Sequence, residues 1–471
     1  MRVKVSKNIL FTAGLIMLIG FHLNAQQSYR VTAKQAVDIA FQNVAAIKNA
    51  KLDYKFAEYR NKEITGAAFP QISGALQGNH YLSLPLIQFP DAAEDAIYRV
   101  LEREGVKDAN GQPVNPDNAE FNVNSFSFFA PWNVTGSVSV NQLLFEPQVF
   151  VGLQARKALL ESGEINIKVE EDKVREAVYK NYYAVLIAEK QLGFVRESIK
   201  RLDKLTSDMN VMFTNGFVEK LDIDKTTVTL NNTKAAENQL NNGIAIGYAL
   251  LKATMGLSQS DSIILVDELT STAIKEGILE ENFSYENRNE IKLLNKAVEL
   301  QGYDIRRYKL SYAPTVAAFY SFQQNGQRNE NFKSFTGKSW FWYSTNLIGI
   351  NISIPIFDGF QKKYKILQSQ ATLEKVQNTL DNAKKGIDME RTASRNTLTN
   401  SILTMDVQEK NMELAEKVYN TVKKKYEQGL GSSFEVLQSD TDMQQAQSNY
   451  FRALYEAMIA RVSYLKALGT L

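Results

Sequence analysis

Hydrophobic and polar residues follow two periods along this chain, and the two periods alternate in the same order twice. Apolar residues recur at spacings of three and four over residues 31–67, which is typical of an amphipathic helix. Pro70 ends this run, because a proline ring disfavours helical backbone in the residue before it. The pattern returns over 285–312 and ends at Pro314, 244 positions after the first proline. We predict a helix in each of these two segments.

After each proline the period changes from about 3.6 to two, which predicts β-strands. The clearest case places isoleucine at every second position from Ile348 to Ile356. One apolar and one polar face over about ten residues is the pattern of a membrane-barrel strand, with lipid on one side and water on the other. A strand of a soluble sandwich alternates in the same way, so the pattern alone leaves both possibilities open. Four strands are predicted, at 69–83, 133–146, 314–323 and 341–356.

The tryptophans favour the membrane barrel. Trp132, Trp340 and Trp342 all lie at the loop end of the second strand of a pair, and a cluster of aromatic side chains at one strand end is expected at a membrane interface. A soluble core would scatter them. The connecting loops are unequal: 84–130 is long and contains an acid-capped start to a short helix, whereas 324–340 is short and polar. Long loops on one side suit the extracellular face of an outer membrane.

The longest predicted elements are helices. No proline occurs between residues 148 and 313 or after residue 355, and apolar residues follow coiled-coil spacing over about six heptads before Phe213. The sequence predicts long helices over 148–213 and 359–427, each about 100 Å long at about 1.5 Å per residue. No compact domain can enclose a helix of that length.

Each long helix ends at a glycine that can take a positive φ and turn the chain. Gly216 and Gly429 occupy these positions, and a second amphipathic helix follows each of them. Sliding the chain by 213 positions superposes the two segments without a gap, so the chain consists of two copies of one unit. The predicted tips are 214–221 and 428–434, the returning helices are 222–256 and 435–469, and the repeats are 26–256 and 283–471, joined by a polar, acidic linker at 257–282.

Composition narrows the classes of function. Residues 1–25 have the charged, apolar and small-residue order of a secretory signal peptide, and we expect cleavage after Ala25. This segment holds three of the 54 Lys and Arg residues and none of the 52 Asp and Glu residues. The remaining charges nearly balance, which gives no support for nucleic-acid binding.

Candidate catalytic chemistry is sparse. The chain has no cysteine, which excludes a disulfide scaffold, a thiol nucleophile, a Cys-ligated metal and a lipid-modified cysteine. His80 is the only histidine outside the expected signal peptide, so no histidine-based triad or metal site can be built. No glycine-rich phosphate loop is present. We therefore predict that the protein is not an enzyme and uses no cofactor or metal.

The order of helix, strand, loop, strand, long helix, glycine tip and returning helix, present twice, resembles the TolC family of outer-membrane channel-tunnel proteins. The matching motifs are Phe-Pro-Gln-Ile at 69–72, Tyr-x-x-Gly at 426–429 followed by Phe-Glu-Val-Leu at 434–437, and Lys-Ala-Leu-Gly at 466–469. The resemblance covers nearly all of residues 30–471. It implies a mixed α and β membrane protein that assembles as a homotrimer. Each protomer gives four strands to a twelve-stranded outer-membrane β-barrel, which continues as a long antiparallel α-helical coiled-coil tunnel in the periplasm.

The resemblance also implies functional residues at the tips. Gly216, Phe217, Gly429 and Leu430 match the tips that dock a periplasmic adaptor protein bound to an inner-membrane transporter. Acidic residues beyond the second tip form constricting rings in relatives. The candidate gate residues here are Asp222, Glu435, Gln438 and Asp440.

Glu435 occupies the position of the first acidic ring. Gln438 occupies that of the second, which puts a double acidic gate in doubt, and Asp440 is the candidate replacement on a neighbouring face. A structural explanation stands beside this one. An acid in the first turn of a helix is stabilised by about 0.3–1 kcal/mol through the helix dipole, and this alone accounts for Asp222 and Glu435.

The sequence therefore predicts a passive trimeric duct of a tripartite efflux or type I secretion system. An adaptor and an inner-membrane transporter open it to export small molecules or proteins across the outer membrane. The alternative is a non-transport envelope scaffold, anchored by a barrel, whose coiled coils hold partners. The cargo is not indicated, because a wide wet lumen contacts it without a shaped pocket.

Overall fold

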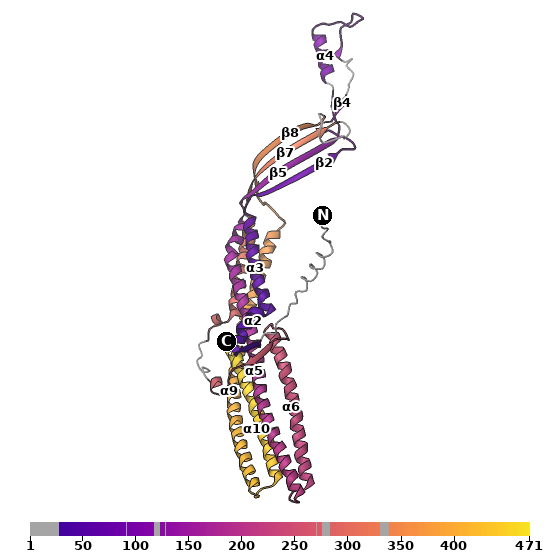
Figure 1. Cartoon of the computed structure of the whole chain (residues 1–471). Helices are drawn as coiled ribbons and strands as arrows, with labels where there is room; N and C mark the ends of the chain where they lie inside the picture. Colours follow the sequence, from indigo (N-terminus) through magenta and orange to yellow (C-terminus); the bar gives the residue numbers. More distant parts are fainter. Residues whose placement is uncertain are drawn as a thin grey trace, which may run out of the picture. The chain divides into compact units, whose positions relative to one another are not determined.

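The computed structural model describes residues 28–90, 92–116, 123–127, 129–269, 271–275, 283–329 and 339–471. The expected signal peptide lies outside these residues, as do parts of the predicted loops and linker. The chain divides into two compact units (Figure 1). The helical unit comprises Met1–Glu58, Lys157–Gly302 and Gln370–Leu471, and the sheet unit comprises Tyr59–Arg156 and Tyr303–Ser369.

The sheet unit contains a four-stranded antiparallel sheet (Figure 1). Its strands, in spatial order, are β2 (Gln71–His80), β5 (Trp132–Phe145), β7 (Thr315–Arg328) and β8 (Phe341–Ser353). The register aligns Ile72 with Val140, Tyr320 and Ile348. Because side chains alternate along a strand, the apolar positions of all four strands share one face. Strand β7 ends five residues beyond the predicted 314–323, because its polar end still pairs with both neighbours.

The predicted loop 84–130 carries structure of its own. Strands β3 (Ile87–Pro90) and β4 (Val123–Phe126) form an antiparallel pair. Helix α4 (Ala92–Arg103) follows β3, where the sequence indicated a short helix. Its apolar residues recur on one side of the helix, with Ile97 and Val100 exposed.

The helical unit is built from helices of unequal length, of which α5 has 68 residues and α9 has 67. The helices are α2 (Ala33–Asn43), α3 (Ala45–Gly66), α5 (Pro147–Thr214), α6 (Lys220–Thr254), α8 (Asn289–Leu310), α9 (Gln361–Glu427) and α10 (Ser433–Leu468). Several of these helices extend beyond the unit in sequence. None of the helices in the described ranges has an apolar stretch long enough to cross a membrane.

The single helix predicted over 31–67 is wrong, because the chain forms two helices with a break at Val44. This residue has φ −66° and ψ 130°, which is extended backbone. Gly256, at the end of the returning helix, packs against the break so closely that a Cβ there would lie 2.8 Å from the carbonyl carbon of Asn43. The second repeat has the same contact, because a Cβ at Gly469 would lie 2.9 Å from the carbonyl carbon of Asn287.

The segment predicted as a linker at 257–282 also holds regular structure. It contains β6 (Ser262–Leu265) and α7 (Ser271–Lys275), and β6 pairs in parallel with β1 (Ser28–Val31). One acidic residue of this segment has a local role: the Asp267 carboxylate accepts a hydrogen bond of 2.8 Å from the backbone N–H of Ala33 at the start of α2. Strand β6 has only four residues, and the polar composition of the whole 257–282 segment did not indicate it.

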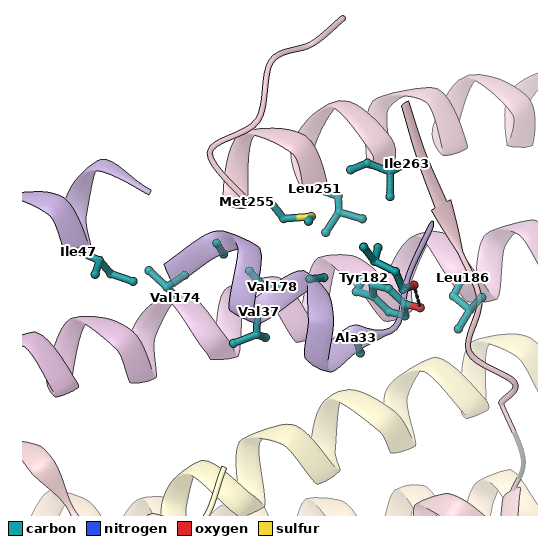
Figure 2. Close-up of a cluster of buried hydrophobic side chains, with 13 residues drawn as sticks. Ala33, Val37, Ile47, Val174, Val178, Tyr182, Leu186, Leu251, Met255 and Ile263 are labelled. Carbon is teal, nitrogen blue, oxygen red and sulfur yellow. Dashed lines mark hydrogen bonds between the residues drawn. The ribbon is translucent and has the colours of Figure 1, made fainter. Parts of the chain in front are cut away.

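A buried apolar cluster joins both ends of the first repeat (Figure 2). Tyr182 on α5 is fully buried there and donates a hydrogen bond of 2.9 Å to the carbonyl oxygen of Val31. Residues from α2, α3, α5, α6, β1 and β6 contribute: Val31, Ala33, Ala36, Val37, Ala40, Ile47, Val174, Val178, Tyr182, Leu186, Leu251, Met255 and Ile263. The short β1–β6 pair is therefore part of the core.

Candidate functional site at the hairpin tips

The first tip follows α5 and turns at Gly216. The Gly216 φ is 79°, and the backbone N–H of Phe217 donates to the carbonyl oxygen of Met212 at 3.0 Å. This bond closes the end of the helix in the manner of a Schellman motif. The Phe217 side chain is 78% exposed, which leaves a large apolar group at the end of the hairpin.

The second tip repeats this geometry. Gly429 has φ 75°, and the backbone N–H of Leu430 donates to the carbonyl oxygen of Lys425 at 2.9 Å. The Leu430 side chain is 76% exposed. The two tips therefore present the same pair of features, a left-handed glycine followed by an exposed apolar side chain.

The two hairpins pack against each other at this end. Tyr419 and Val436 of the second hairpin belong to the same buried cluster as Met209 and Ile223 of the first. Closer to the tips, the Lys225 ammonium lies 5.7 Å from the centre of the Phe434 ring. A cation over an aromatic face is attracted by the ring quadrupole.

Glu435 lies in the first turn of α10 and its side chain is exposed. The Ser432 hydroxyl caps this helix by accepting a hydrogen bond of 3.2 Å from the Glu435 backbone N–H. A Cβ at Gly431 would lie 3.3 Å from the Glu435 carboxylate, so the absence of a side chain at Gly431 gives that carboxylate room at the tip. The exposed carboxylate can bind cations from solvent, and it also interacts favourably with the positive end of the α10 helix dipole.

Two other candidates, the half-buried Asp222 and the exposed Gln438, have local partners. Asp222 lies in the first turn of α6, 3.8 Å from the Lys225 ammonium. Gln438 is exposed, and its side-chain amide donates a hydrogen bond of 2.8 Å to Asp442. A glutamine carries no charge, so Gln438 cannot form a second acidic ring.

Asp440 does not occupy the position expected of a pore-lining replacement. It is only 1% exposed, between α5 and α10. Its carboxylate accepts hydrogen bonds of 2.8 Å from the Ser198 hydroxyl and 2.8 Å from the Arg201 guanidinium. Gln444 donates a third, of 2.6 Å. Residues 435 and 438 are three positions apart and share the exposed side of α10, whereas Asp440 lies on the side that packs on α5.

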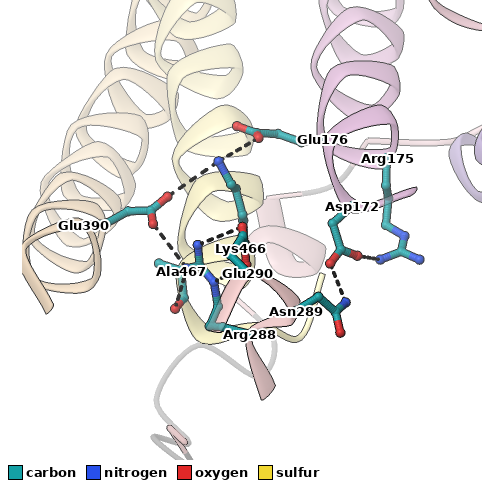
Figure 3. A network of polar contacts seen from close by, with 9 residues as sticks. All are labelled: Asp172, Arg175, Glu176, Arg288, Asn289, Glu290, Glu390, Lys466 and Ala467. Atoms are coloured by element: carbon teal, nitrogen blue, oxygen red, sulfur yellow. Dashed lines mark hydrogen bonds and ion pairs between the residues drawn. The ribbon is translucent and has the colours of Figure 1, made fainter. Parts of the chain in front are cut away.

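A charged network that the sequence analysis did not predict lies near the end of α10 (Figure 3). The Arg288 guanidinium, with its side chain 6% exposed, contacts Glu290 at 3.2 Å and Glu390 at 3.1 Å. It also donates a hydrogen bond of 3.2 Å to the carbonyl oxygen of Ala467. Lys466 joins the network through Glu390 at 3.6 Å. These contacts fasten the start of α8 to α9 and α10.

Electrostatic interactions shift the pKa values of this network. Burial alone would raise the pKa of Glu176, but hydrogen bonds from Lys180 and Lys466 outweigh it and lower that pKa from its ordinary value. Glu290 behaves in the same way, because Arg288 offsets its burial and lowers its pKa. Both carboxylates are therefore held in the charged form, as expected for acids beside cations.

The tryptophans gather at one end of the sheet. Trp132 stacks on His80 with ring centres 3.8 Å apart. Trp340 stacks on Trp342 at 5.7 Å. The register places Trp132 in the last paired row of β5 with β7 and Trp342 in the row before the last of β7 with β8. Among the described residues, no group of His, Asp and Glu is arranged to hold a metal ion.

Comparison with known proteins agrees with this arrangement. Residues 284–470 match the family model described as outer membrane efflux protein. Outer membrane protein TolC of Salmonella enteritidis is 21% identical over 450 residues, which cover 92% of this chain and 84% of that protein. Outer membrane protein TolC of Vibrio cholerae serotype O1 is 18% identical over 343 residues, which cover 72% of this chain and 77% of that protein.

Solved channel structures have the same fold. The crystal structure of CusC superposes with a TM-score of 0.69 at 13% identity and covers 95% of each chain. VceC from Vibrio cholerae gives a TM-score of 0.65 at 12% identity, with 93% of this chain and 96% of that chain covered. The relatives favour the duct over the scaffold as the function of this chain.

Proposed function

Because the chain belongs to the TolC family of outer-membrane efflux proteins, we propose that three copies close one twelve-stranded barrel that opens into a helical tunnel. The protein is an outer-membrane efflux channel whose helices extend into the periplasm.

The observation that carries the trimer is the pair of open sheet edges. Strands β2 and β8 each pair on one side only within the described residues. The apolar face of the sheet is open too, with Ile72 72% and Ile348 81% exposed. Unpaired backbone groups are costly in lipid. Pairing of β8 with β2 of the next copy removes both edges and leaves the apolar face to the membrane.

The helices joined to the edge strands support the same contact. Helix α3, which leads into β2, exposes Phe56 and Tyr59, and α9, which follows β8, exposes Tyr364 and Leu367. Within each helix the two residues are three positions apart, so they form one apolar stripe. Each stripe lies on the helix that would sit beside a neighbouring copy.

The tips are the proposed docking site for the adaptor of a tripartite system. Phe217 and Leu430 are apolar, exposed and held at the ends of rigid helices. Exposed aromatic and aliphatic anchors of this kind dominate protein interfaces. Glu435, exposed beside the second tip, is the proposed gate residue. Three copies of its carboxylate around one axis would attract cations and narrow the opening.

Adjacent substitutions on β8 test the barrel. Ile350→Lys places a charge on the apolar face, which destabilises a membrane barrel by about 2–4 kcal/mol near mid-membrane. Asn351→Lys places the same charge on the polar face. We expect the first to reduce the amount of folded trimer in membranes and the second to keep the trimer and change its conductance. Equal tolerance of both would refute the assignment of faces.

The tip and gate are tested separately in planar bilayers and in cells. Phe217→Asp combined with Leu430→Asp should abolish efflux and adaptor cross-linking while the purified channel still conducts ions. Glu435→Gln should raise closed-state conductance and lower cation selectivity. Glu416→Gln, which removes the charge of an exposed acid on α9, should do neither. An unchanged closed state in the Glu435 variant would exclude it as the gate.

A further inference from the structure

A basic and aromatic surface lies where α8 and α9 meet the sheet. We call it the basic collar, and its cationic residues are Arg306, Arg307, Lys309, Lys362, Lys363 and Lys365. The two segments that supply them, 303–312 and 358–365, contain only two acidic residues, Asp304 and Asp358. The segments are neighbours in space, because the Lys362 ammonium lies 5.5 Å from the centre of the Tyr312 ring.

Both acidic residues of these segments, Asp304 and Asp358, already have partners within the protomer. Asp304 pairs with Arg307 at 2.8 Å. Asp358 accepts a hydrogen bond of 3.0 Å from the backbone N–H of Lys362 and so caps α9. In the ranges that the structure describes, no carboxylate forms an ion pair with Arg306, Lys309 or Lys365. The collar therefore carries net positive charge that the protomer does not neutralise.

The polarity along this edge changes in a fixed order. The apolar face of β8 continues beyond the strand through Ile354 and Ile356, which are 62% and 94% exposed. Exposed aromatic residues come next, with Phe357 75% and Phe360 57% exposed. The lysines at the start of α9 follow. Hydrocarbon, then aromatic, then cationic is the order that a lipid leaflet presents from its acyl chains to its phosphates.

We propose that the basic collar binds the phosphates of anionic phospholipids in the leaflet from which the helices emerge. The inference rests on the proposed barrel, which orients the apolar face toward lipid. Charge complementarity selects this occupant, because a zwitterionic leaflet has no net charge to attract unpaired cations, whereas an anionic leaflet attracts each nearby Lys or Arg about fivefold. The exposed aromatic residues anchor at the same depth.

The experiment measures lipid selectivity of the full chain. The purified protein is reconstituted in phosphatidylcholine vesicles, and electron spin resonance compares spin-labelled phosphatidylglycerol with spin-labelled phosphatidylcholine at the protein surface. We expect the native protein to prefer phosphatidylglycerol severalfold. The preference should fall as salt is raised from about 0.01 to 1 M, because salt screens exposed charges. No preference in the native protein at low salt overturns the proposal.

A charge-matched pair of variants localises the effect. The collar variant is Arg306→Gln, Lys309→Gln and Lys365→Gln, and the control is Lys190→Gln, Lys204→Gln and Lys410→Gln, which removes the same charge from exposed helix positions of the helical unit. The collar variant should lose at least threefold of the preference, and the control should keep it. Equal loss in both variants would assign the preference to net charge and refute the collar.

Conductance of the same samples separates the two proposals. A conducting trimer without lipid preference refutes the collar and leaves the channel standing. A sample that forms no trimer and no pore refutes the proposed barrel instead. Where the triple variant does not fold, the single variants Arg306→Gln, Lys309→Gln and Lys365→Gln are compared with the control variant, and a preference unchanged in all three refutes the collar.

Discussion

The two glycines that end the returning helices offer the sharpest test of the repeat. Gly256 and Gly469 have φ values of 68° and 75°. Each packs on a backbone carbonyl, so an added Cβ would lie 2.8 Å from Asn43 and 2.9 Å from Asn287. The tip glycine Gly429 has the same φ of 75°, but a Cβ there would meet nothing within 4 Å.

The difference between these positions can be worked out. An alanine in the left-handed region costs about 1–2 kcal/mol at any of them. Where the Cβ also overlaps backbone, repacking adds about 1–3 kcal/mol. We therefore expect Gly469→Ala and Gly256→Ala to lower the free energy of unfolding by about 2–5 kcal/mol. Gly429→Ala should lower it by about 1–2 kcal/mol only.

The assay is urea unfolding in detergent, followed by the helical circular dichroism signal, with the midpoint and slope fitted for each variant. Gly302→Ala is the control, because Gly302 lies inside α8 with nothing within 4 Å of its Cβ. Alanine there should stabilise the helix by up to about 1 kcal/mol. Equal losses for Gly469→Ala and Gly429→Ala would refute the claim that close packing, rather than φ alone, requires glycine at the junction.

Three further predictions follow from other contacts. Asp440→Ala removes a buried acceptor from the partly exposed Arg201 guanidinium and from the Ser198 hydroxyl, and should lower the free energy of unfolding by about 1–3 kcal/mol in the same urea assay. Acidification should destabilise the helical unit, because Glu176 and Glu290 have lowered pKa values in the folded protein. The stability that they contribute is present above the ordinary glutamate pKa and is lost as pH falls through the folded pKa values. Urea midpoints measured between pH 3 and 7 test this loss of stability, and a constant midpoint would contradict it. Gly326→Ala puts a Cβ 2.7 Å from a tryptophan ring on β8 and should weaken the sheet, measured as a lower temperature for loss of the compact band on electrophoresis.

Local periodicity was enough to predict most of the elements. The alternation that predicts β8 depends only on neighbouring residues, and so does the proline-free span that predicts α5. Local periodicity does not predict the register that aligns Ile72, Val140 and Tyr320 in one row. This register depends on pairing between segments far apart in sequence, and a shift of one strand by one residue would move all of its side chains to the other face of the sheet.

The missed features depend on distant contacts. The break at Val44 interrupts a continuous helical pattern, because Gly256 docks on it from the end of α6. The burial of Asp440 depends on Ser198 and Arg201, which lie on α5 more than 230 residues away. The positions of acidic residues after a tip do not show which of these side chains packs against α5.

The paired junctions explain why the two repeats differ chemically while sharing one backbone design. Val44 follows Asn43 in the first junction and packs on the apolar cluster, whereas Arg288 follows Asn287 in the second and enters an ionic network. The backbone of both residues is extended, with ψ of 130° and 115°. The glycine contact sets the geometry in both cases, and the neighbouring side chain decides how the junction responds to its surroundings. A hydrocarbon junction is insensitive to pH and salt. A buried ionic one holds only while all its partners are charged, so acid or loss of one partner should loosen the second repeat before the first.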